Sequence, residues 1–117
     1  MRFSESLKQN RDFKRLYARG KSAASPLLVV YCRRNGSDRN RLGLTVGTKV
    51  GKAVHRNRIR RRLREIYRLH EPEFQTGYDI VIVARMRAAG ADYHRLEREL
   101  LRSLQKLGIR PQQEDAT

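Results

Sequence analysis

Residues 49–68 combine a dense basic run with apolar residues at helical spacing. The segment holds nine lysines and arginines and a single acid. On a helix that turns about 100° per residue, Ile59, Leu63 and Ile66 share one side, and most of the arginines fall on the opposite side. A disordered basic arm has no need for this segregation. The spacing therefore predicts an amphipathic helix over residues 52–69, with its apolar face inward and its basic face outward.

The basic segment carries +8 of a formal net charge of +15 on 117 residues. The length fits one domain with a modest core, because only 38% of the residues are hydrophobic and there is no tryptophan. A small domain this basic is expected to bind a polyanion. Arginine greatly outnumbers lysine in the segment, and its planar guanidinium can bind phosphate through two hydrogen bonds and stack on bases. We therefore expect a nucleic acid as the partner.

Other features of the sequence exclude several classes of protein. A single cysteine, Cys32, rules out an internal disulfide framework and a cysteine-based zinc site. No run approaches the roughly 18 apolar residues of a membrane span, and Arg2, Glu5 and Lys8 interrupt any signal-peptide core. We expect a cytoplasmic protein with no membrane association and no obligate protein partner.

The acids and histidines do not suggest a nuclease site in the protein itself. The acids are scattered without a metal-ligand spacing, and His55, His70 and His94 are separated and lack evident partners. No glycine-rich phosphate loop of the P-loop or Rossmann kind is present. We therefore expect no catalytic residue in this chain, and the sequence predicts no particular metal site.

Hydrophobic periodicity and terminal residues predict a chain of mixed helices and strands. Helices are expected at residues 10–19, 52–69 and 92–107. Strands are expected at residues 27–32, 41–46 and 78–84, and residues 21–24 can add a short edge strand. Asn35-Gly36, between two of these strands, is a strong hairpin signal.

These elements fit one α+β domain in which helices pack on a mixed sheet, over residues 1–108. General connection rules favour a right-handed crossover for the strand–helix–strand unit. Residues 109–117 contain Pro111, two glutamines and two acids, and we expect them to form a flexible C-terminal tail.

Residues 50–64, VGKAVHRNRIRRRLR, resemble the signature of the bacterial ribonuclease P protein subunit, an Arg-Asn-Arg core on a helix. Further matching pieces follow in the family's order: Asp12-Phe13, RLGLTV at residues 41–46, and GYDIV at residues 77–81. A lone Arg-Asn-Arg would be a weak signal, whereas the long pattern with collinear flanking pieces is specific. The resemblance covers roughly residues 3–107.

The resemblance implies a fold and a task. The family fold is a single-domain sandwich of a four-stranded mixed sheet and three helices, in α-β-β-β-α-β-α order, with an unusual left-handed crossover. Its members bind a large catalytic RNA and help it remove the 5′ leader of precursor tRNA. The RNA performs the hydrolysis with metal ions, so the resemblance implies Mg²⁺ held mainly by RNA and no organic cofactor. The protein supplies substrate affinity and favours metal binding.

The resemblance also assigns two surfaces of this chain. The family's basic helix faces the ribonuclease P RNA, which here implies contacts from Lys52, Arg56, Asn57, Arg58, Arg60, Arg61, Arg64 and Arg68. The family's leader cleft lies on the sheet beside the first helix, and position by position it corresponds to Phe13, Tyr17 and Tyr31, with Arg11 and Lys49 nearby.

The chemistry of these aromatic residues agrees with a leader cleft, because single-stranded nucleic acid is held by aromatic platforms beside a positive groove. Packing in the core is the alternative for all three. The sequence alone favours packing for Phe13, and it favours neither interpretation for Tyr17 and Tyr31, because a phenol suits a half-wet surface.

Other nucleic-acid-binding proteins fit part of the pattern. A ribosomal or ribosome-assembly protein would share the size and charge, and only the long motif argues against it. A DNA-binding regulator is expected to join two helices by a short turn, whereas the basic helix here is flanked by a loop and a strand.

Overall fold

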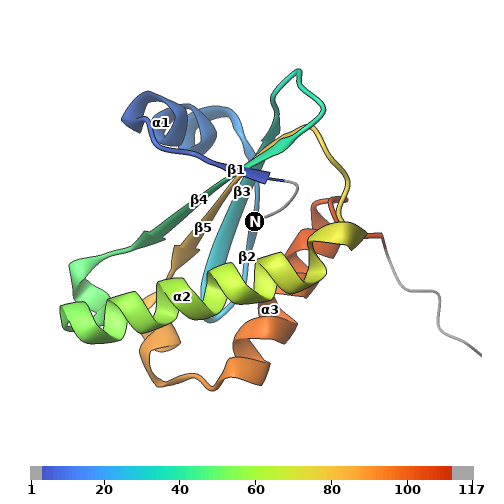
Figure 1. Ribbon diagram of the computed structural model, residues 1–117. Coiled ribbons are helices and arrows are strands. Elements are labelled where there is room, and N and C mark those ends of the chain that lie inside the picture. The colour runs from blue at the N-terminus through green and yellow to red at the C-terminus, as the bar shows by residue number, and fades with distance from the viewer. Residues whose placement is uncertain (1–3, 112–117) are drawn as a thin grey trace, which may run out of the picture.

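The computed structural model describes residues 4–111 and contains three helices and five strands (Figure 1). The helices are α1 (Asn10–Arg19), α2 (Ala53–His70) and α3 (Tyr93–Lys106). The strands are β1 (Ser4–Ser6), β2 (Lys21–Ala24), β3 (Leu28–Arg34), β4 (Asn40–Val46) and β5 (Tyr78–Ala84). Short 3₁₀ turns are η1 (Thr48–Val50), η2 (Glu71–Glu73) and η3 (Met86–Gly90). The predicted α+β class and all three helices are confirmed.

The strands form one mixed sheet in the order β1-β4-β5-β3-β2, with one strand more than expected. The added strand, β1, pairs in parallel with the start of β4, and the chain then continues into a hydrogen bond from Leu7 N to Leu42 O of 2.8 Å. Its sequence, Ser-Glu-Ser, has no apolar alternation, so nothing local marks it as a strand.

The hairpin expected at Asn35-Gly36 does not form. Gly36 adopts the turn conformation, with φ of 74°, but β5 lies between β3 and β4, so these two strands do not pair. The loop binds the start of β5 instead: Asn35 N donates to Gly77 O at 2.9 Å, and the Asn35 side chain donates to Asp79 at 3.1 Å. The chain does turn at Asn35-Gly36, but β5 lies between β3 and β4, so the two strands that flank the turn do not form a hairpin.

The connection from β4 through α2 to the parallel neighbour β5 is left-handed. In Figure 1 both strands run downward, α2 crosses in front of the sheet, and β5 lies to the right of β4. This agrees with the family resemblance and departs from the general preference for right-handed crossovers.

The helices cover the two faces of the sheet unequally. On one face α2 and α3 bury the main core, in which Ile59, Leu63 and Ile66 meet alternate residues of the strands, as their spacing predicts. Tyr67 of α2 joins this core and bonds Ser4 through its hydroxyl at 2.9 Å. On the other face α1 buries a smaller cluster that includes Leu16, and part of the sheet stays half-open.

Three of the motif pieces meet on the α1 face. Arg41 binds Asp79 through two hydrogen bonds of 2.6 and 2.7 Å, and its guanidinium lies 3.7 Å from Asp12. The hydrogen bonds to Asp79 raise the pKa of Arg41, partly opposed by burial, so the Arg41 guanidinium stays charged. The acids in these motifs therefore tie α1 to β4 and β5.

Two residues beyond the expected boundary at residue 108 pack against the domain. Ile109 is fully buried, and its carbonyl accepts a hydrogen bond of 2.7 Å from Gln75 N. Arg110 pairs with Glu73 at 3.1 Å. These two residues of the predicted tail therefore pack against the domain, and residues 112–117 lie outside the described part.

Candidate RNA interface

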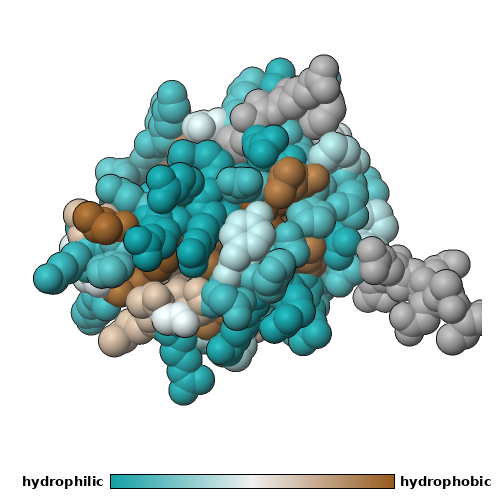
Figure 2. All heavy atoms as spheres, turned by 60° about the horizontal axis from the view of Figure 1, so that its bottom comes forward, coloured by the Kyte–Doolittle hydropathy of each residue, from teal (hydrophilic) through white to brown (hydrophobic). Residues whose placement is uncertain are grey.

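The basic helix presents the face that its sequence predicts. Six of the residues expected to contact RNA are exposed: Lys52, Asn57, Arg58, Arg61, Arg64 and Arg68. The other two, Arg56 and Arg60, are half-buried. Figure 2 brings forward the side that is at the bottom of Figure 1, and hydrophilic side chains cover most of it. Positive charge held on a rigid helix forms a continuous site for a phosphate backbone.

The two half-buried arginines are held more firmly than the exposed ones. Arg60 donates to the Asn57 side chain at 3.2 Å and to the Val46 carbonyl at 3.4 Å, which ties α2 to the end of β4. The Arg56 Nε is buried without a hydrogen-bond partner among residues 4–111. A buried guanidinium donor without a hydrogen-bond partner is costly.

The three aromatic residues of the expected leader cleft come together beside α1. The rings of Tyr17 and Tyr31 meet edge to face, with centroids 5.0 Å apart. The Tyr17 hydroxyl lies 3.3 Å from Thr45 Oγ1, and 42% of Tyr17 is exposed. Phe13 is half-buried and packs directly over Gly43. These rings line a surface rather than a closed core.

Two hollows in this surface meet at Phe13. One, of about 350 Å³, is lined by Asn10, Phe13, Lys14, Tyr17 and Thr45. The other, of about 270 Å³, lies between β4 and α2, and its walls include Lys8, Phe13, Arg60 and Arg64. The two hollows therefore join the aromatic cleft to the basic face of α2.

The structure adds lining residues that the sequence did not single out and places two expected ones elsewhere. Lys8, Lys14 and Thr45 line the hollows. Lys14 follows Phe13 in α1, and adjacent helix residues do not face each other, so no spacing signal marked it. Arg11 and Lys49 are exposed, and neither is among the residues lining these two hollows.

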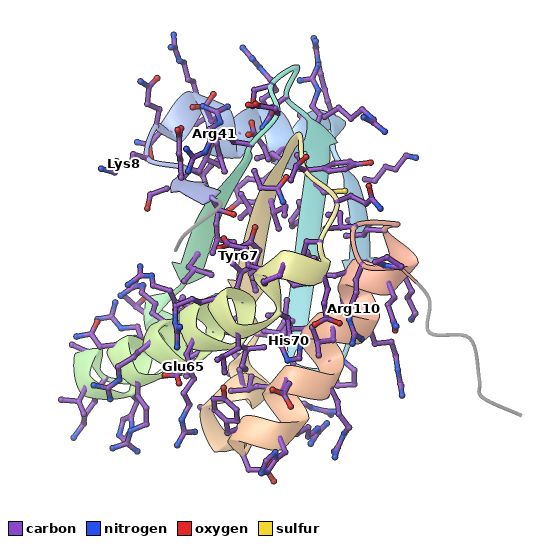
Figure 3. The ribbon with its side chains drawn as sticks, turned by 45° about the vertical axis from the view of Figure 1, so that its right-hand side comes forward. Lys8, Arg41, Glu65, Tyr67, His70 and Arg110 are labelled. Atoms are coloured by element: carbon purple, nitrogen blue, oxygen red, sulfur yellow. The ribbon has the colours of Figure 1, made fainter. Side chains whose placement is uncertain are left out.

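His70 lies away from these surfaces and has a structural role. His70, expected to lack partners, bonds Glu73 at 2.6 Å and Glu97 at 3.3 Å, and it joins the end of α2 to α3 (Figure 3). Within residues 4–111 no group of three or more His, Cys, Asp or Glu side chains could hold a metal ion. None of the helices in that range is long and apolar enough to cross a membrane.

Known proteins match this chain over most of its length. A family model described as Ribonuclease P matches residues 1–108. The ribonuclease P protein component of Natranaerobius thermophilus is 44% identical over 101 residues, covering 86% of this chain and 88% of the relative. That of Alkaliphilus oremlandii is 41% identical over 109 residues, covering 93% and 96%.

Solved structures agree with the sequence relatives. The Staphylococcus aureus RNase P protein superimposes with a TM-score of 0.83 at 34% identity, covering 89% of this chain and 95% of that one. The Thermotoga maritima RNase P protein superimposes with a TM-score of 0.77 at 36% identity, covering 84% and 93%. Sequence and fold are therefore similar to the same set of proteins over most of the chain.

Proposed function

The chain belongs to the bacterial ribonuclease P protein family and is a subunit of a tRNA-processing endoribonuclease, and from this premise we propose a division of labour between its two surfaces. The basic face of α2 binds the ribonuclease P RNA. The cleft beside α1 guides the 5′ leader of precursor tRNA. The RNA then removes the leader with Mg²⁺ to give the mature 5′ end.

The arrangement of α2 supports its assignment to the folded RNA. Its exposed cations extend along one helix face, which suits the regularly spaced phosphates of a structured RNA. Each phosphate neutralised releases condensed counterions, so binding through this face falls steeply with added salt. The half-buried Arg56 and Arg60 set the position of the helix start against the RNA.

The cleft supports a single-stranded partner, because its rings can take unstacked bases. Stacking on an aromatic side chain contributes about 1–3 kcal/mol per base and tolerates sequence variation. Lys14 stands beside the rings, where a phosphate of the strand would pass. The hollow between Phe13 and α2 is the observation that best supports the proposal. It allows one RNA strand to run from the aromatic rings to Arg60 and Arg64.

The protein contributes binding rather than bond cleavage. Several acids of the described residues are engaged in structure, as in the pairing of Asp79 with Arg41 and of Glu73 with His70. We propose that the RNA holds most of the Mg²⁺ and that the protein raises substrate affinity beside it. Fixed positive charge near the RNA also lowers the repulsion between phosphates that Mg²⁺ would otherwise have to offset.

Reconstitution tests this function directly. The purified chain is added to its cognate ribonuclease P RNA, and cleavage of a precursor tRNA is followed at low Mg²⁺. Stimulated cleavage at the mature 5′ end is expected. Tight RNA binding with no stimulation would contradict the proposed role, and cleavage by the protein alone would contradict the assignment of the chemistry to RNA.

A further inference from the structure

A second basic pocket lies on the opposite end of the sheet from the start of α2. It has a volume of about 310 Å³, and the lining residues used below are Arg19, Lys21, Cys32, Arg33, Arg34 and Tyr78. We call it the distal pocket. It shares no lining residue with the hollows around Phe13.

The distal pocket lies far from the start of α2. It lies where β3 ends and β5 begins, whereas α2 begins beyond the end of β4, which runs parallel to β5. The length of one seven-residue strand, roughly 20 Å, lies between the two places. Figure 1 shows the same separation, with the β3–β4 loop at the top and the start of α2 at the lower left.

One arginine of the distal pocket is already positioned. The Arg34 guanidinium lies over the Tyr78 ring, 5.1 Å from its centroid. This cation–π contact holds the planar group in place while leaving its hydrogen-bond donors free for a ligand. A side chain ordered in advance loses less entropy on binding, so Arg34 is suited to hold a phosphate group.

A tight turn brings two more cations to the same rim. Gly20 ends α1 and leads directly into β2, and a Cβ at this position would lie 2.6 Å from Leu16 O and 2.9 Å from Cys32 O. Only glycine allows this close approach, which places Arg19 and Lys21 on either side of the turn. Lys21 then lies opposite Cys32 in the register of β2 and β3.

Nothing in the described structure neutralises these cations. Arg19, Lys21, Arg33 and Arg34 take part in no ion pair within residues 4–111. The carbonyl end of α1 adds a partial negative charge of about one half, which is small against four full positive charges. Burial raises the pKa of the Cys32 thiol, although Lys21 lowers it, so the thiol stays neutral and adds no negative charge to the pocket.

We propose that the distal pocket binds the phosphodiester backbone of RNA, as a contact additional to those of α2 and the aromatic cleft. Converging cations around a concave site, with a stacked guanidinium at its wall, suit a phosphate better than a neutral ligand. The contact rests on the proposed function, because the RNA that reaches it is the ribonuclease P RNA. It would hold a strand that crosses the far end of the sheet.

The test measures how binding of ribonuclease P RNA depends on salt. The double variant Lys21→Gln/Arg34→Gln is compared with wild type and with Arg98→Gln/Arg102→Gln, which removes the same charge from exposed positions on α3. The slope of log Kobs against log salt is expected to fall by about two for the pocket variant, since each lost phosphate contact lowers it by about one. The control variant should keep the wild-type slope. Thermal unfolding checks that both variants fold.

Two further measurements separate the possible causes. An Arg61→Gln variant on α2 should lower the slope by about one, so an α2 effect without a pocket effect overturns this inference while leaving the proposed function intact. Inorganic phosphate alone is added during thermal unfolding of wild type and pocket variant. Stabilisation of wild type only, with an unchanged RNA slope, would show a site for small phosphates and overturn the RNA assignment.

Discussion

At the scale of single residues, Glu99 stabilises the fold through its charge. Its carboxylate accepts a hydrogen bond of 2.9 Å from the backbone N–H of the fully buried Leu27, and Arg95 donates to it at 3.0 Å. Burial raises the pKa of Glu99. The hydrogen bonds from Leu27, Arg95 and Ser25 lower it by more, so the pKa lies below its ordinary value of 4.5. Glu99 therefore links α3 to the start of β3.

We expect Glu99→Gln to lower the free energy of unfolding at pH 7 by about 1–2 kcal/mol, because the Leu27 N–H loses a charged acceptor. A carboxyl with a lowered pKa stabilises the fold above its ordinary pKa and loses that contribution as pH falls through the folded value. The difference between wild type and variant should therefore shrink below pH 4.5. Urea unfolding across pH 3–7 measures this, with the exposed Glu65→Gln as control. A constant difference would contradict the assignment.

Residue roles that depend on spacing could be predicted from the sequence, and those that depend on distant partners could not. Ile59, Leu63 and Ile66 follow the helical period, so their burial could be predicted from the sequence. His70 binds Glu97, which lies 27 positions away on another helix, and no local pattern indicates that pairing. The sequence favoured packing for Phe13, and it could not show that the same ring, which packs on Gly43, also lines both hollows.

At the scale of elements, β4 and α1 fit together because Gly43 has no side chain. A Cβ at this position would lie 2.6 Å from the tip of the Phe13 ring. We expect Gly43→Ala to push the ring aside, to destabilise the fold by about 1–3 kcal/mol and to weaken binding of leader-bearing precursor tRNA. Gly47→Ala is the matched control, since a Cβ there meets nothing within 4 Å and its φ is −72°. If the two variants bind leader-bearing precursor tRNA equally, Phe13 does not contribute to leader binding.

Element positions were more predictable than element partners. The predicted first helix and the strand at residues 78–84 match α1 and β5 to the residue, because each has its own periodicity and flanking breakers. β1 was missed since its pairing with β4 comes from the backbone alone. The pairing of β3 with β4 was wrong because β5 was inserted between them from a later part of the chain. The residues of a turn predict the local bend of the chain, but they do not predict which strands pair beside it.

At the scale of the whole molecule, the residue that follows the last turn after α3, Ile109, closes the core that α2 and α3 share. Ile109 is fully buried and its backbone bonds both Leu104 and Gln75, so it fastens the end of α3 to the segment before β5. We expect Ile109→Ala to cost about 2–5 kcal/mol, the usual range for such a cavity. Leu69→Ala, at a position that is 52% exposed, should change the stability little. A small effect at residue 109 in urea unfolding would contradict a structural role for this segment.

The net charge of the whole molecule indicates which class of partner it binds, and the fold determines on which surfaces the charged residues lie. The net charge of +15 predicts a polyanion without saying where it binds. The fold places the basic face of α2 and the aromatic cleft on different elements, and the two hollows that meet at Phe13 connect them. Substitutions on the two surfaces should therefore affect different substrates. The sequence could not give this arrangement, because it depends on the crossover that carries α2 over the sheet.

Tyr31 tests that separation. Tyr31→Ala removes one stacking platform, so binding of precursor tRNA with a long leader should weaken by about 1–3 kcal/mol, or roughly 5- to 150-fold. Mature tRNA has no leader and should bind the reconstituted enzyme equally with wild type and variant. Tyr31→Phe keeps the ring that meets Tyr17 edge to face, and it should retain most of the affinity. Equal losses on precursor and mature tRNA would instead mean that Tyr31 supports packing, because a damaged fold weakens both substrates alike.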